Sequence, residues 1–145
     1  MISEIATEAL YYSTNHEWCH VDENLITVGL TDVRLKELGE ILYLDLPDEG
    51  KTVHQGESFF SMESLKSTHD FSSPVGGMVL EVNDAIQETP GILNDDPFNE
   101  GWLVRIEMES EKDLAHLMRF DSYKKFVISP GSWQPRVAEI ATILG

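Results

Sequence analysis

Lys66 is the residue whose position in the sequence most suggests covalent chemistry. It lies between two strand-like runs, Glu57–Met62 and Ser67–Ser72, and the short turn that joins them contains no glycine or proline. This pattern predicts a hairpin with an exposed lysine at its tip, where rigid strands fix the base of a long side chain. Because most surface lysines are simply solvated, a covalent role for Lys66 needs further support from the residues around it.

His16, Cys19 and His20 are close enough in the sequence to raise the possibility of a metal site. Histidines four residues apart share one face of a helix, but this segment has the composition of a strand. Four strand residues span roughly 13 Å, too far for two ligands with bonds near 2 Å to share one zinc ion. We therefore predict no metal site. The single cysteine also excludes an internal disulfide framework.

The composition is strongly acidic. The 145 residues include 26 acidic and 10 basic side chains, which gives a formal net charge of −16. This charge repels nucleic acid and anionic membrane surfaces, so we predict neither as a partner, and it favours basic proteins. The sequence has neither an apolar run long enough to span a membrane nor the basic and apolar parts of a signal peptide. A cytoplasmic location is expected.

The segment around Lys66 is less acidic than its surroundings. Residues 51–80 contain three acidic and two basic residues, whereas residues 1–50 contain eleven and two, and residues 81–121 contain eleven and three. Two interpretations stay open. The acidic segments provide a solvated surface that keeps the protein soluble, or they guide partners towards a nearly neutral contact region.

Short strands separated by turns predict the framework that positions Lys66. We expect a hairpin over residues 11–29, a short helix over 31–39 and a strand over 40–46. Further strands are expected at 51–53, 57–62, 67–72, 78–82 and 102–108. This spacing is typical of a small β-barrel or sandwich.

Two later segments are expected to be less regular. Residues 83–101 predict a long polar loop with one helical turn. Ser110 then predicts the start of a helix, with Asp113 as the second residue of a capping box. The apolar stripe of this helix consists of Leu114, Leu117, Met118 and Phe126.

The residues around Lys66 resemble the lipoylation site of the glycine cleavage H-protein family. The family core reads E-S-x-K-A, followed by D-x-x-S-P-x-x-G. The matching residues here are Glu63, Ser64, Lys66, Asp70, Ser73, Pro74 and Gly77. Other segments that resemble the family are His16–Trp18, Thr27–Asp32, Leu46–Gly50 and Asn94–Trp102. The matches run in order from about Tyr12 to Phe126, so they cover most of the chain.

This resemblance implies a mostly β lipoyl hammerhead, also called a barrel-sandwich hybrid, with short flanking helices. It implies that Lys66 carries lipoic acid in amide linkage, that Glu63 is recognised by the lipoylating enzyme, and that Glu17 lines a cleft for the loaded arm. We predict a single lipoyl-carrier domain over residues 1–127 and a C-terminal extension over 128–145. The protein is expected to be a non-catalytic carrier.

The resemblance also implies the partners. A lipoate ligase or lipoyltransferase would attach the lipoyl group. Glycine decarboxylase, aminomethyltransferase and lipoamide dehydrogenase would then use the carrier, which would shuttle an aminomethyl group and reducing equivalents between them. A carrier that stays covalently attached to its cargo raises the effective concentration of that cargo at each enzyme.

Departures from the family pattern leave alternatives open. Leu65 replaces the usual valine, and Ser67-Thr68-His69 replaces a run of small residues. These changes raise a second hypothesis, a lipoate-binding carrier of sulfur intermediates that works with enzymes of heterodisulfide-reductase-like sulfur oxidation. A third is an unmodified interaction module that kept the fold. Biotin carriers place methionine on both sides of their lysine, and this sequence does not.

Overall fold

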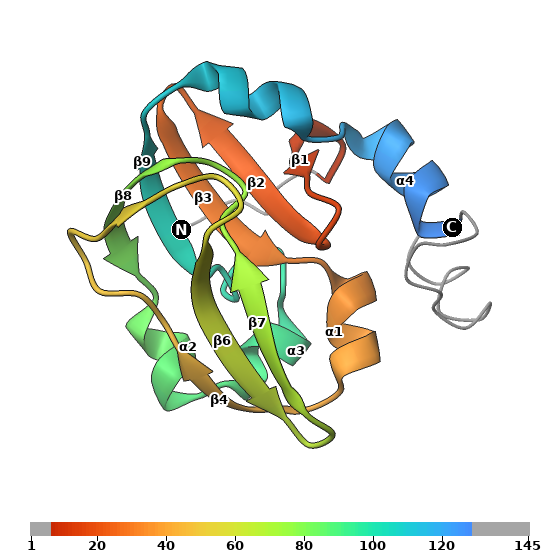
Figure 1. Ribbon diagram of the computed structural model, residues 1–145. Coiled ribbons are helices and arrows are strands. Elements are labelled where there is room, and N and C mark those ends of the chain that lie inside the picture. The colour runs from red at the N-terminus through yellow and green to blue at the C-terminus, as the bar shows by residue number, and fades with distance from the viewer. Residues whose placement is uncertain (1–6, 129–145) are drawn as a thin grey trace.

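The computed structural model describes residues 7–128, which form two antiparallel sheets with short helices around them (Figure 1). The larger sheet has the order β1-β2-β3-β9-β8-β5. Its strands are β1 (Tyr11–Tyr12), β2 (Glu17–Asp22), β3 (Leu25–Leu30), β5 (Thr52–Val53), β8 (Gly77–Val82) and β9 (Val104–Met108). The smaller sheet has the order β4-β6-β7. Its strands are β4 (Ile41–Asp45), β6 (Ser58–Ser64) and β7 (Thr68–Ser72).

The helices are short and lie around the sheets. They are the 3₁₀ helices η1 (Thr7–Ala9) and η2 (Glu111–His116) and the α-helices α1 (Asp32–Leu38), α2 (Asp84–Glu88), α3 (Gly91–Asp95) and α4 (Phe120–Ile128). The mostly β fold with short helices that the sequence predicts is confirmed. The predicted extension, residues 128–145, lies outside the described residues except for Ile128. Within residues 7–128, no helix is both long and apolar enough to cross a membrane.

One apolar core joins the two sheets. It contains buried side chains from both sheets and from α1, α2 and α3, among them Val28, Leu35, Leu44, Met62, Ile86, Leu93 and Ile106. Strand β9 shows the alternation of a strand with one face on this core, because Val104, Ile106 and Met108 are buried while Arg105 and Glu107 are not. Burial of this surface holds the small sheet, and with it the β6–β7 hairpin, against the larger one.

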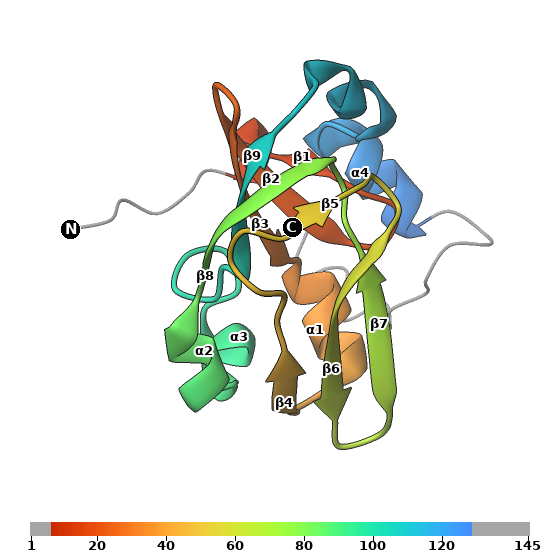
Figure 2. The same ribbon diagram turned by 60° about the vertical axis from the view of Figure 1, so that its left-hand side comes forward.

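The predicted helix at residues 31–39 is confirmed, and its ends form as its sequence indicates. The Thr31 hydroxyl accepts a hydrogen bond from the Arg34 amide, which satisfies one of the free donors of the first turn. Gly39 ends the helix with φ 78°, a conformation that a side chain disfavours, and its amide donates to the Leu35 carbonyl. This helix lies beside the β6–β7 hairpin (Figure 2).

The prediction for residues 83–101 is wrong in part, because this segment forms two helices. The Asn83 side chain caps α2 and also donates to the Glu100 and Trp102 carbonyls, which closes the segment on itself. Ile86 and Leu93 are then fully buried in the core. The polar composition of the segment gave no indication in the sequence that Ile86 and Leu93 would be buried.

The single helix predicted from Ser110 is confirmed only at its start, where the Ser110 hydroxyl accepts a hydrogen bond from the Lys112 amide and caps the 3₁₀ helix η2. Asp113 accepts a hydrogen bond from the Gly76 amide at 2.7 Å, so it does not complete a capping box with Ser110. Helix η2 ends at His116, and after a short non-helical segment the helix α4 begins at Phe120. The predicted apolar residues still pack on the core, but the buried residues of α4 are Tyr123 and Val127.

Helix α4 is attached to the start of the chain by an aromatic cluster. The rings of Tyr12 and Tyr123 stack with centroids 4.4 Å apart. The Tyr123 hydroxyl also makes hydrogen bonds with His16 Nδ1 at 2.8 Å and with the Thr31 hydroxyl at 2.9 Å. These contacts connect α4, β1 and the N-terminus of α1 into one unit.

Candidate functional site

Lys66 lies in the turn between β6 and β7, as the sequence predicts. Both views show this turn at the edge of the molecule, beyond the ends of β4 and α1 (Figures 1 and 2). Lys66 and its two neighbours, Leu65 and Ser67, are exposed. The lysine amine is therefore accessible to a large partner from several directions.

Ser64 holds the turn in shape. Its hydroxyl, which is buried, accepts hydrogen bonds from the amides of Lys66 and Ser67 and donates to the Ser67 carbonyl. The Ser64 amide also donates to that carbonyl at 2.9 Å, and the Leu65 amide donates to the Glu40 carbonyl at 3.1 Å. The Ser64 side chain thus stabilises the turn, a role that glycine or proline has in many turns. Because the turn is stabilised, the backbone at Lys66 is held in place.

Glu63 lies on the solvent-exposed face of the hairpin, close to Lys66. It pairs with Tyr43 of β4 on one side and with Thr68 of β7 on the other, and its side chain is exposed. A carboxylate in this position is available to a protein that approaches the turn.

A polar cleft of about 340 Å³ lies at the other end of β7. Its lining comes from the loop before β2, the loop before β6, the end of β7 and the end of η2, and includes Ser13, Asn15, Glu17, Ser72, Ser73 and His116. Strand β7 separates the cleft from the turn, and the four steps between its first and last residues, at about 3.4 Å each, span roughly 14 Å. We refer to it as the arm cleft, after the role that the resemblance implies for Glu17.

Glu17 is the unusual residue of the arm cleft. Its side chain is fully buried, and its Oε1 atom accepts a hydrogen bond from the Ser13 hydroxyl at 2.9 Å. Its Oε2 atom is buried without a hydrogen-bond partner among residues 7–128. Burial raises the pKa of Glu17 to about 8. A buried carboxyl with a free oxygen beside a polar cleft is suited to receive a cationic group.

The histidines of the possible metal site do not lie as expected. His16 falls in the turn before β2, with φ 63°, and the predicted strand begins one residue later. Its ring contacts Tyr123, while Cys19 is buried and the next residue, His20, is half-buried. Among the residues described, no three His, Cys, Asp or Glu side chains are grouped so that they could hold a metal ion.

Sequence reasoning missed the polar residues that accompany Glu17. Ser13 lies four residues before Glu17, and Asn15 donates to the Ser72 hydroxyl at 2.9 Å across 57 residues of sequence. The only available signal was the polar run Ser13–Asn15 before the strand. Because the cleft is assembled from four separate segments, no local pattern could predict it.

The chain is similar to known proteins of one family. The model of the family described as "Glycine cleavage H-protein" matches residues 10–129. "Glycine cleavage system H protein 2, mitochondrial" of Arabidopsis thaliana is 41% identical over 124 residues, which cover 86% of this chain and 80% of that protein. The Coprothermobacter proteolyticus "Glycine cleavage system H protein" is 44% identical over 121 residues, which cover 83% of this chain and 95% of the relative.

A solved structure gives the same result for the fold. The crystal structure of a glycine cleavage system H protein from Mycobacterium marinum matches with a TM-score of 0.73 and 30% sequence identity. The match covers 80% of this chain and 94% of that protein. The two proteins thus share one fold, which supports the lipoyl barrel-sandwich fold expected from the sequence.

Proposed function

This chain belongs to the glycine cleavage H-protein family and has the lipoyl-carrier role of that family in glycine cleavage, and we propose that Lys66 is the residue that carries its lipoic acid. The observation that carries the proposal is the exposed lysine at the tip of a hairpin whose turn is fixed by Ser64. When attached, the lipoyl group supplies a dithiolane that accepts an aminomethyl group and electrons. The protein contributes a rigid base for that arm and acts as a substrate of its partner enzymes, with no catalysis of its own.

Glu63 is proposed to help the lipoylating enzyme recognise the turn. Its exposed carboxylate lies three residues before Lys66, and it projects from the strand that leads directly into the turn. A basic residue of a lipoate ligase or lipoyltransferase could pair with it while Lys66 enters the active site of that enzyme.

The arm cleft is proposed to shelter the loaded arm. Burial favours the protonated form of Glu17 in the unloaded protein, and a cationic amine beside its free Oε2 atom would favour the ionised form and supply its charge partner. Ser13 would keep the carboxyl in position through its hydroxyl. An anionic sulfur group would gain no such charge partner, so the cleft favours the aminomethyl cargo over the sulfur cargo.

The partners follow from this role. We propose glycine decarboxylase, aminomethyltransferase and lipoamide dehydrogenase as the enzymes that load, unload and reoxidise the arm. The net charge of −16 would steer basic surfaces of these enzymes towards the carrier. The cytoplasmic location expected from the sequence stays a prediction.

Loading by the decarboxylase tests the proposed function. Lipoylated protein, incubated with glycine and glycine decarboxylase, is expected to gain an aminomethyl group, measured as a mass increase of the Lys66 peptide. The increase should disappear when glycine is left out. A lipoylated preparation that stays unloaded, while the same decarboxylase loads a known H protein, would rule out glycine cleavage as its role.

The buried carboxyl gives a pH-dependent stability that can be measured without the lipoyl group. Because the pKa of Glu17 rises from 4.5 to about 8 on folding, the folded protein holds a proton that the unfolded chain has lost over this range. The stabilisation that comes from the protonated Glu17 carboxyl is therefore fully present below pH 4.5 and is lost as the pH rises to about 8. In Glu17→Gln, which keeps the Ser13 hydrogen bond, we expect the free energy of unfolding at pH 8 to exceed that of the wild type by more than about 1 kcal/mol.

Urea unfolding at pH 5 and pH 8 measures this effect. The difference between the two proteins should be small at pH 5 and should grow towards pH 8. Equal pH profiles for wild type and Glu17→Gln would mean that the carboxyl is ionised in the folded protein, and the raised pKa would be wrong.

A further inference from the structure

Three large apolar side chains are exposed near the base of Lys66. Leu42, Tyr43 and Leu65 have exposed fractions of 47%, 60% and 67%. Single exposed apolar side chains are ordinary, whereas several that lie together often mark a contact with another molecule. We call these three residues the apolar patch.

A β-bulge creates the patch. In β4, Ile41 pairs with Ser64 and Tyr43 pairs with Glu63, so the register shifts at Leu42. In a regular strand two successive residues point to opposite faces, and one of them would be buried. The irregularity instead leaves both Leu42 and Tyr43 exposed, and bulges often redirect side chains in this way next to functional sites.

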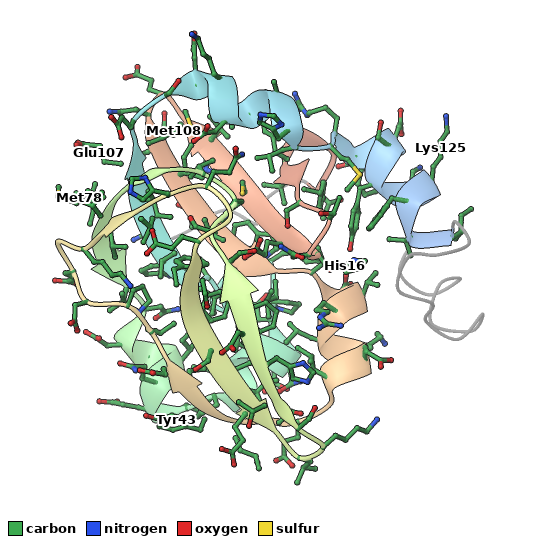
Figure 3. The ribbon with its side chains drawn as sticks, in the orientation of Figure 1. His16, Tyr43, Met78, Glu107, Met108 and Lys125 are labelled. Carbon is green, nitrogen blue, oxygen red and sulfur yellow. The ribbon has the colours of Figure 1, made fainter. Side chains whose placement is uncertain are left out.

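The patch and the turn form one continuous surface. Tyr43 is the direct neighbour of Glu63, and the Leu65 amide donates to the Glu40 carbonyl just before β4. Figure 3 shows Tyr43 at the end of the molecule where the β6–β7 turn lies. A protein that covers both the Lys66 turn and the start of β4 would therefore contact the patch.

The short length of the unmodified lysine side chain indicates which partner enzyme must approach the patch most closely. Enzymes that act on a completed lipoyl arm react with its far end, so their active sites need not reach the lysine. The enzyme that attaches the arm must bring its acyl donor to the lysine amine itself, only one side chain away from the turn. We therefore expect the attaching enzyme to contact β4 and the hairpin directly.

Charges around the patch indicate what that surface contains. The exposed acidic side chains next to it are Glu40, Asp45 and Glu63, and Lys66 is the one basic residue in the turn. A complementary partner has an apolar pocket with basic residues around it. A partner of a purely acidic surface would need basic residues alone and no apolar pocket.

We propose that Leu42, Tyr43 and Leu65 form the docking site for the enzyme that acylates Lys66. The inference rests on the proposed lipoylation of this lysine. The enzyme brings an activated lipoyl donor, an acyl adenylate or an acyl thioester. A bond forms between the lysine nitrogen and the acyl carbon, the bond from that carbon to its leaving group breaks, and the amine loses one proton to solvent.

The test measures the kinetics of lipoylation with a purified lipoate ligase, lipoate and ATP, followed by intact mass. In the double variant Leu42→Ser/Tyr43→Ser, the KM for the carrier is expected to rise at least about tenfold, with kcat changed less than about twofold. The wild-type KM should also rise with salt, because the acidic residues around the patch are screened.

Met78→Ser and Leu80→Ser serve as matched controls. These residues are exposed to 38% and 41%, but they lie on β8 of the other sheet, and Figure 3 shows Met78 far from the turn. Their KM should equal that of the wild type. Thermal unfolding shows that each variant is folded, which is expected because all four side chains are at the surface.

The possible outcomes separate this inference from the proposed function. Normal lipoylation of the double variant, with the wild type lipoylated at Lys66, overturns the docking site and leaves the carrier role intact. A loss of decarboxylase loading without a change in lipoylation assigns the patch to another enzyme and also overturns it. Failure of the wild type to accept lipoate at Lys66 overturns both.

Discussion

Lys66→Arg is expected to abolish lipoylation and all carrier activity. Arginine keeps the positive charge and the exposed position in the turn, so binding surfaces and folding stay unchanged. Its guanidinium does not lose a proton in proteins, and it offers no free amine for amide formation. Intact and peptide mass spectrometry, on protein from cells supplied with lipoate and a matching ligase, should show a lipoyl increment on the wild-type Lys66 peptide alone.

Lys51→Arg is the matched control. Lys51 is the other lysine of the nearly neutral segment 51–80 and is also exposed, but it lies outside the hairpin. It should keep full lipoylation. A lipoyl increment in Lys66→Arg, or on any other lysine of the wild type, would show that Lys66 is the wrong site. A wild type without increment, with an active ligase, would favour the unmodified interaction module.

Gly77→Ala is expected to cause the largest loss of stability. A Cβ atom at this position would overlap the carbonyl oxygen of Glu107 in the neighbouring strand. The backbone has little room to move away, because Gly77 pairs with Met108 of β9 on one side and with Val53 of β5 on the other. Figure 3 shows Glu107 and Met108 beside the start of β8. We expect a loss of about 3 kcal/mol or more, and a Tm lower by roughly 10 °C.

Gly76→Ala provides a control one residue away. A Cβ atom there would meet its nearest neighbour, an oxygen of Asp113, at 3.4 Å, an ordinary contact distance. Its Tm should stay within about 2–3 °C of the wild type, because the added methyl group would meet no atom closer than an ordinary contact distance, although Gly76 is buried. Equal stability of the two variants would mean that β8 and β9 can separate locally and that the sheet is looser than described.

The elements that hold Lys66 were predictable because their signals are local. Thr31 and Gly39 mark the two ends of α1 in the sequence. The hairpin around Lys66 follows from two β-rich runs joined by a short turn, and β6 and β7 are found there. The role of Ser64 was not predicted, although its place in the E-S-x-K pattern marked it as part of the site.

The irregular elements were not predictable for a physical reason. The run Ile41-Leu42-Tyr43-Leu44 is apolar throughout, which in a regular strand indicates burial on both faces. The shift in register exposes two of these residues, and it depends on how β6 pairs with β4. Helix α4 likewise depends on contacts of Tyr123 with residues more than 90 positions away.

The sequence predicted where Lys66 and Glu63 of the candidate site lie, but not the cleft. Lys66 and Glu63 lie in one motif, whereas the arm cleft needs residues from four separate segments. The sequence suggested Glu17 by resemblance, but its burial and its free oxygen come from the packing of the loops around it. The charge and spacing of residues in a sequence do not show whether a carboxyl such as that of Glu17 is buried or lacks a hydrogen-bond partner.

The order of strands in the larger sheet has a consequence for synthesis of the chain. Strand β3 needs β9 as its neighbour, and β9 ends at Met108, so the sheet cannot close until about forty residues after Lys66 have left the ribosome. The β6–β7 hairpin, by contrast, is built from residues close in sequence and can form early. Strand β4, however, packs on the helices α2 and α3, which are made later. An acylating enzyme that reads β4 as well as the turn would therefore modify finished domains and leave nascent chains unmodified.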